Sequence, residues 1–119
     1  MGVFREALQR LQSRVEGTLA VTLIGLDGIP IESINEGQIP LDAVSAEFTG
    51  FLKSIQSSNN DIETGSVQHV AVMTDRYIIN LSVVTSEYLI LMVMSRDGNH
   101  GRARFELQKA KFALKDELI

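Results

Sequence analysis

The segment GLDGIPIES at residues 25–33 contains residue types found in phosphate-binding loops. Closely spaced glycines let backbone amides approach a phosphate, but such a loop also needs a following helix and a nearby lysine. Gly25 and Gly28 are flanked by β-type residues, and the segment has no lysine. Asp27-Gly28 instead predicts a two-residue hairpin turn, and Pro30, which has no backbone N–H, favours a sheet edge for the second strand.

Few residues are available for enzyme chemistry. The chain has no cysteine and two histidines, His69 and His100, and neither stands in the spacing of a nucleophile elbow or a metal site. The carboxylates of the hairpin would be solvated at a sheet edge. We therefore expect no catalytic residue, no cofactor and no metal. A hydrolase would require one of the two histidines in a cleft beside a nucleophile.

Length and charge narrow the class of protein. A chain of 119 residues suits a single domain, residues 1–119, with one packed core. The formal net charge is -4, which is unfavourable for nucleic-acid binding because Lys and Arg supply most of that affinity. The longest apolar run, residues 88–94, is too short to span a bilayer, and the charged N-terminal segment does not resemble an export signal. We expect a cytoplasmic protein with no nucleic-acid partner and no stable membrane anchor.

Hydrophobic periodicity predicts the order α-β-β-α-β-β-β-α, which is an α+β fold with one antiparallel sheet between helices. The last strand is apolar at every position, so it should be central with both faces covered. Pro40 should open the second helix and the polar segment SSNNDIETG should end it, while Asn99 is the expected N-cap of the last helix. The predicted helices are 3–16, the segment after Pro40 and about 18 residues after Asn99, and the predicted strands are 18–26, 29–34, 66–73, 77–84 and 88–94.

Small residues on the second helix form a second pattern, at spacings of three and four residues. They lie opposite the predicted apolar stripe of Leu41, Val44, Phe48, Phe51, Leu52 and Ile55. Such a seam permits close approach of two helix backbones, and a mid-helix glycine costs on the order of 1 kcal/mol relative to alanine unless something offsets it. We interpret the seam as a homodimer interface, with an exposed small-residue face as the alternative. Its members are Ala43, Ala46, Gly50, Ser54 and Ser57.

The last helix presents aromatic and basic residues away from its predicted core stripe of Ala103, Leu107, Ala110, Leu114 and Leu118. These residues suggest a partner surface. In the alternative interpretation the phenylalanines pack on the first helix and the charges are ordinary solvation. A membrane role looks weak because Glu106, Asp116 and Glu117 nearly balance three of the cations. The candidate partner residues are Arg104, Phe105, Lys111, Phe112 and Lys115.

The element order, LIGLDGIPIES in the first hairpin and GRAR at residues 101–104 together resemble the Roadblock / dynein light-chain family, in particular its bacterial MglB-like members. The resemblance covers nearly the whole chain. It implies a profilin-like, five-stranded sheet with the second helix on one face and the first and last on the other. It also implies dimers that pair through the second helix and the adjacent edge strand 66–73, which places Val67 and His69 in the interface.

The same resemblance implies a small Ras-like GTPase as partner, which the dimer would regulate or hold as a scaffold. MglB-like proteins are understood to stimulate hydrolysis without inserting an arginine, so we assign no such role to Arg76 or Arg96. The alternative functions are a small-molecule sensor and a generic adaptor. A sensor would need an interior pocket of several hundred cubic ångströms lined by the sheet.

Overall fold

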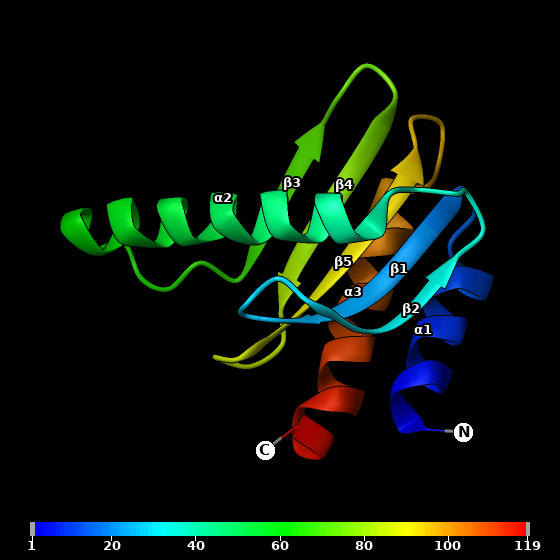
Figure 1. The fold of residues 1–119 in the computed structure, drawn as a ribbon, viewed down its shortest axis with the longest axis horizontal. Helices are drawn as coiled ribbons and strands as arrows, with labels where there is room; N and C mark the ends of the chain where they lie inside the picture. The colour runs from blue at the N-terminus through cyan, green and yellow to red at the C-terminus, as the bar shows by residue number, and fades with distance from the viewer. Residues whose placement is uncertain (1, 119) are drawn as a thin grey trace.

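The computed structural model describes residues 2–118, with the side chains of residues 59–62 outside that description. The element order agrees with the sequence prediction, and the layers are visible in Figure 1. The elements are α1 (Val3–Arg14), β1 (Thr18–Gly25), β2 (Pro30–Asn35), α2 (Leu41–Ile62), β3 (His69–Met73), β4 (Tyr77–Val83), β5 (Tyr88–Ser95), α3 (His100–Lys115) and the 3-10 turn η1 (Asp116–Leu118).

The five strands form one antiparallel sheet in the order β2-β1-β5-β4-β3. The prediction that the strand after Pro30 is an edge is confirmed, and so is the central place of the apolar strand β5. Residues 89–94 of β5 are all buried, since helices cover both faces of the sheet. β2 and β3 are therefore the two edges.

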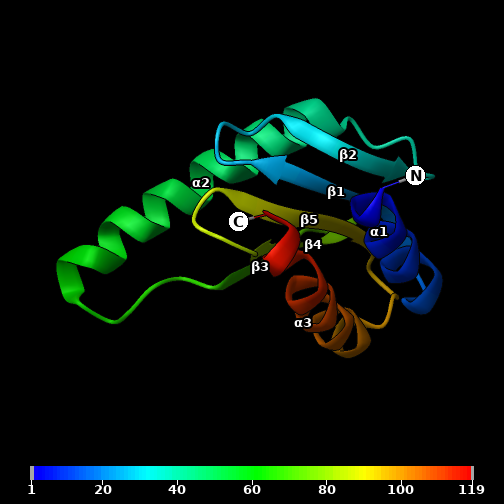
Figure 2. The same cartoon turned by 90° about the horizontal axis from the view of Figure 1, so that it is seen from below.

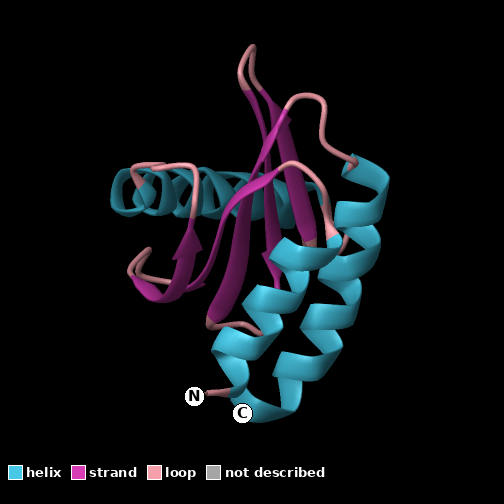
Figure 3. Ribbon diagram, turned by 90° about the vertical axis from the view of Figure 1, so that its right-hand side faces the viewer, coloured by secondary structure: helices cyan, strands magenta, loops and turns pink. Residues whose placement is uncertain are grey.

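Helices cover the sheet from both sides. α2 crosses one face, and α1 and α3 lie side by side on the other (Figures 2 and 3). Alternate residues of each strand point to opposite faces, so the sheet contributes to two separate cores. Leu23 and Met92 belong to the α1 and α3 side, while Ile24 and Leu91 belong to the α2 side. None of the described helices has the length and apolar character needed to cross a bilayer.

The first hairpin differs from the predicted two-residue turn. Its loop comprises residues 26–29, closed by Gly28 N–H to Gly25 O (2.9 Å) and Gly25 N–H to Ile29 O (3.2 Å). Asp27 Oδ1 accepts from Ile29 N–H at 3.0 Å, and the strand register shifts between Leu23 and Ile24. The longer loop is a turn from Gly25 to Gly28 that ends in the left-handed conformation of Gly28, as longer hairpin loops commonly do.

Gly28 also fixes where α2 lies on the hairpin. Its φ is +84°, a conformation that favours glycine, and an added Cβ would be 3.2 Å from the Cα of Ala46. The absence of a side chain at this position therefore lets the turn approach the backbone of α2.

Several boundaries differ from the predicted ones. α2 continues through the polar segment to Ile62 and ends at Glu63, whose φ of 55° is left-handed. Serine and asparagine disfavour a helix only weakly, and the first glycine beyond them is Gly65. At the other end of the chain α3 is shorter than expected, and it begins at the predicted N-cap, where Asn99 Oδ1 accepts from Arg102 N–H at 2.9 Å.

Candidate interaction surfaces

The α2 seam, which comprises the five small residues named above, lies on the solvent side of the helix. All five are exposed: Ala43, Ala46, Gly50, Ser54 and Ser57. A Cβ added at Gly50 would meet no atom of the described residues within 4 Å. The seam is thus free in a single chain, and its role as a dimer interface stays a prediction.

Only the first half of α2 is covered by the sheet. Its buried residues are Leu41, Ser45, Thr49 and Leu52. Beyond Leu52, no side chain of α2 that the structure describes is fully buried. Figures 1 and 2 show this second half extending past the edge of the sheet at β3. A helix end that projects beyond its own sheet leaves its side chains available to another molecule.

Phe51 does not lie in the core stripe where the periodicity placed it. Its side chain is 47% exposed, because it lies on the flank of α2 a quarter turn or so from the fully buried Leu52. Its ring meets that of Phe48 edge to face, with centroids 6.4 Å apart. These two rings, Glu47 and Val72 of β3 line an apolar groove of about 290 Å³.

The free edge of β3 adjoins this groove. Thr74 N–H donates to Tyr77 O (2.8 Å) and Val83 N–H donates to Gln68 O (2.9 Å), so even-numbered residues bond to β4. Backbone groups alternate in direction along an antiparallel strand. His69, Ala71 and Met73 therefore direct their backbone N–H and C=O toward the open edge.

Val67 lies outside the strand in which it was predicted, whereas His69 lies on the edge strand as predicted, and the place of both in a dimer interface stays a prediction. The strand begins at His69, so Val67 precedes it and packs, half-buried, against the α2-side core. Residues 66–68 contribute no regular strand because Gln68 makes the last cross-strand bond. His69 does lie on the edge strand, with its side chain toward α3.

Two histidines meet at one buried amide. His69 Nε2 and His100 Nε2 lie 2.9 and 3.0 Å from Asn80 Oδ1, and Asn80 is fully buried on β4. Burial lowers the pKa of His69, and the nearby Arg104, His100 and Lys111 lower it further against the opposing hydrogen bond from Asn80. Sequence reasoning missed this cluster, since nothing in the spacing of residues 69, 80 and 100 shows that they converge.

The candidate residues on α3 form an exposed ridge. Phe105 is 55% exposed and Phe112 75%, so the alternative that they pack on α1 is wrong. α1 meets α3 through a different side, where Ala7, Leu11 and Ala110 lie. Arg104 and Lys115 are exposed, and Lys111 Nζ donates to Gln68 Oε1 at 3.0 Å.

The ridge contains two cations that sequence reasoning did not select. The guanidinium carbon of Arg102 and Nζ of Lys109 lie 5.8 and 5.5 Å from the centroid of the Phe105 ring. Both also face Glu106, which is only 3% exposed: Arg102 Nη2 is 2.9 Å from its Oε2 and Lys109 Nζ is 4.0 Å from its Oε1. A third cation, Arg14 of α1, lies with its Nη1 3.6 Å from Oε1 of Glu106. Helical spacing from Phe105 would have identified both cations.

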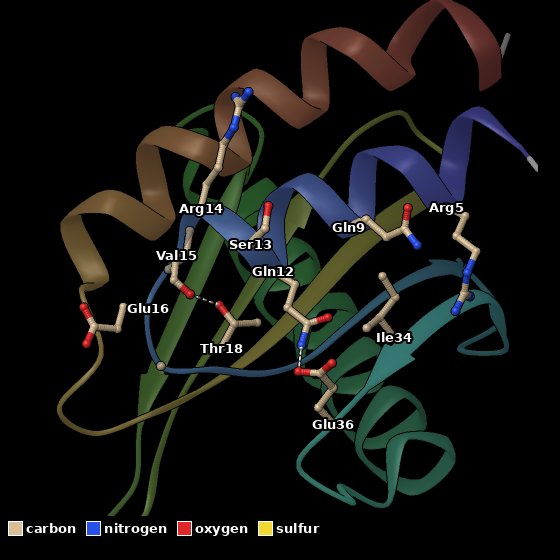
Figure 4. Close-up of a pocket in the computed structure, with 11 residues that line it drawn as sticks. Arg5, Gln9, Gln12, Ser13, Arg14, Val15, Glu16, Thr18, Ile34 and Glu36 are labelled. Carbon is tan, nitrogen blue, oxygen red and sulfur yellow. Dashed lines mark hydrogen bonds between the residues drawn. The ribbon is translucent and has the colours of Figure 1, made fainter.

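A polar hollow of about 780 Å³ lies between α1 and the β1–β2 hairpin (Figure 4). Two pairs of its lining residues bond to each other: Gln12 donates to Glu36, and Thr18 Oγ1 donates to Val15 O at 2.8 Å. The hollow opens on the surface beside β2 and is not enclosed between the sheet and a helix layer. It therefore does not meet the condition set for a small-molecule sensor. Its lining is Arg5, Gln9, Gln12, Ser13, Arg14, Val15, Glu16, Gly17, Thr18, Ile34 and Glu36.

Comparison with known proteins identifies the fold of this chain. No family model matches the sequence, and no curated protein matches it significantly. Solved structures do match it over nearly the whole chain. A Roadblock/LC7 domain from Streptomyces avermitilis has a TM-score of 0.85 at 20% identity, with 95% of each chain covered. Myxococcus xanthus MglB has a TM-score of 0.87 at 16% identity, covering 97% of this chain and 94% of that one. MglC from Myxococcus xanthus has a TM-score of 0.70 at 24% identity, covering 98% and 99%.

The chain has the Roadblock fold. The layer arrangement implied by the sequence resemblance, with α2 on one face and α1 and α3 on the other, is confirmed. A profilin from Acanthamoeba castellanii also matches, at a TM-score of 0.57, which agrees with the expected profilin-like fold. In the Roadblock fold of this chain, the α2 seam and the α3 ridge lie on opposite faces of the sheet.

Proposed function

We propose that this chain forms a cytoplasmic homodimer that binds a small Ras-like GTPase and regulates it or holds it as a scaffold. The dimer would have no nucleotide site of its own. The observation that carries the proposal is the uncovered second half of α2 beside the free edge of β3. Together they leave one contiguous surface of the Roadblock fold without a partner inside the chain.

Pairing of two chains would cover this surface. Two β3 edges joined about a two-fold axis would continue the sheet from one chain into the other and satisfy the backbone groups of His69, Ala71 and Met73. The projecting end of α2 would then lie against the partner's α2 and the apolar groove at Phe51. One MglB structure has a tetrameric arrangement, which supports self-association in proteins of this fold.

The GTPase partner rests on the likeness to MglB and on the sequence resemblance to MglB-like regulators. An arginine that completes a GTPase site should protrude freely from a loop. Arg96 instead donates from Nη1 to Thr74 O at 2.9 Å, which ties it to the β3–β4 turn. We therefore assign no catalytic role to Arg96, and we propose that any stimulation acts through residues of the GTPase.

The dimer is tested by Gly50→Glu. The added side chain has free space in a single chain, so the fold should persist, but two charged side chains would face each other across paired helices. We expect a folded monomer by sedimentation and a native circular dichroism spectrum. Gln9→Glu adds the same charge to an exposed position of α1 and should leave the dimer intact. A Gly50→Glu protein that stays dimeric would exclude the seam from the interface.

The partner is tested by affinity capture on the intact protein, with either GDP or a non-hydrolysable GTP analogue present. The specific expectation is retention of a small GTPase in one nucleotide state, followed by titration of that purified GTPase in both states. A binder shifts an equilibrium only through differential affinity. Equal affinity for the two states would contradict a regulatory role.

A further inference from the structure

The positive charge of the chain is concentrated on one face. Residues 3–16 and 100–117, which form the α1 and α3 layer and its ends, contain eight of the eleven Lys and Arg residues. They contain only five of the fifteen Asp and Glu residues. The overall charge of -4 therefore conceals a basic face opposite an acidic remainder, and any ligand of the basic face should be anionic.

The centre of this face is the α3 ridge. Phe105 and Phe112 are two helical turns apart, so both rings project from the same line along α3. Arg102 and Lys109 lie along one side of that line, and the other cations of the ridge lie along the opposite side. The members of the second row are Arg104, Lys111 and Lys115.

No exposed acid interrupts the ridge between His100 and Lys115. The one carboxylate of the helix, Glu106, is buried and is surrounded by Arg14, Arg102 and Lys109. Glu106 therefore pairs with Arg102 and Lys109 from beneath the ridge and presents no carboxylate at its surface. Asp116 and Glu117 follow in η1, beyond the last cation.

We propose that the α3 ridge binds the surface of an anionic membrane, with Phe105 and Phe112 inserted at the headgroup level and the flanking cations on lipid phosphates. A flat, deformable surface can contact both rings and both rows of cations at once. An acidic protein would have to provide a groove matched to this convex helix. Aromatic rings flanked by Lys and Arg are the features of interfacial helices that lie in the plane of a membrane. This inference does not depend on the GTPase.

The test is co-sedimentation of the full chain with vesicles of phosphatidylcholine alone or with about 30% phosphatidylglycerol, at low and high salt. We expect binding to the anionic vesicles only, and weaker binding at high salt. The double variant Phe105→Ser/Phe112→Ser should lower the bound fraction at least about five-fold. Arg104→Glu/Lys115→Glu should lower it by at least as much and remove most of the salt dependence.

Two controls match these changes in chemistry and lie elsewhere. Ile29→Ser/Ile31→Ser removes two large apolar side chains that are 62% and 48% exposed on the hairpin, and Lys53→Glu/Arg76→Glu reverses two cations outside the ridge. Both should bind as the parent does. The proposal fails if the parent binds both vesicle types equally or neither, or if the folded phenylalanine variant binds as well as the parent. Binding to polyglutamate without binding to vesicles would overturn it in favour of an acidic protein.

Discussion

At the scale of single residues, Gly28 shows how one position can serve both a turn and a helix contact. Its positive φ would strain any other residue, and a Cβ would press on the backbone of α2 at Ala46. The hairpin and α2 are therefore coupled through a missing side chain, and a change at residue 28 should disturb both.

Gly28→Ala should lower the free energy of unfolding by about 1–2 kcal/mol, measured by urea denaturation. Gly101→Ala is the matched control, since residue 101 is helical, exposed and has only Asn99 Oδ1 near an added Cβ, at 3.7 Å. That control should be neutral or stabilising by about 0.5–1 kcal/mol. Equal effects of the two substitutions would show that the approach to Ala46 does not matter.

The free energy of unfolding should depend on pH through His69. Because its pKa is lowered in the folded state, the unfolded chain binds a proton first as the pH falls below the ordinary value of 6.5. The contribution of His69 is complete above that value and is lost as the pH falls through the folded-state pKa. His69→Gln keeps a donor for Asn80 but removes the titration.

We therefore expect the parent to lose more unfolding free energy than His69→Gln between about pH 7.5 and pH 5.5. Urea denaturation at the two values measures this difference. A variant that loses as much as the parent would exclude His69 as the titrating group. The cations Arg104 and Lys111 contribute to the shift, so each should be retained in this experiment.

At the scale of elements, β3 bonds to β4 along one side and leaves the backbone groups of its other side available to a second chain. The N–H of Ala71 points to the open edge, so a proline there removes no hydrogen bond to β4. Ala71→Pro should fold with a native circular dichroism spectrum and sediment as a monomer. Val72→Pro is the contrast, because residue 72 bonds to β4 and its substitution should unfold the edge. A dimeric Ala71→Pro protein would rule out pairing through β3.

The elements themselves were largely predictable from periodicity and turn residues. The apolar run of β5 and Pro30 in β2 were enough to assign a central and an edge strand, because burial on two faces and a missing N–H are local properties. The exposure of Phe51 and the end of α2 at Ile62 were not predictable. The exposure of Phe51 depends on whether another element covers the flank of α2, which is a property of packing. The end of α2 was missed because serine and asparagine disfavour a helix only weakly.

The interaction surfaces were predictable to a lesser degree. Phe105 and Phe112 could be placed opposite the Leu107 stripe by helical spacing alone. Whether another element covers them depends on the distance and rotation of α1, which the sequence does not encode locally. The convergence of His69 and His100 on Asn80 likewise joins three elements that lie far apart in the chain.

At the scale of the whole molecule, the sheet separates two surfaces that face opposite ways. In a dimer formed by antiparallel β3 pairing, the two-fold axis would run perpendicular to the sheet. Both α2 helices would then lie on one face and both α3 ridges on the other. A dimer attached to a membrane through its α3 ridges would leave its α2 face free for a GTPase.

This geometry predicts that dimerisation strengthens membrane binding without being required for it. The monomeric Ala71→Pro protein should still bind anionic vesicles through one ridge, but with an apparent affinity about 10–100-fold below that of the dimer, because two linked contacts act together. Phe105→Ser/Phe112→Ser should show the converse, a normal dimer with impaired vesicle binding. Vesicle titration measures the membrane affinity of both proteins, and sedimentation measures their oligomeric state. If the monomer bound as tightly as the dimer, the two ridges could not lie on a common face, and the two-fold arrangement through β3 would be wrong.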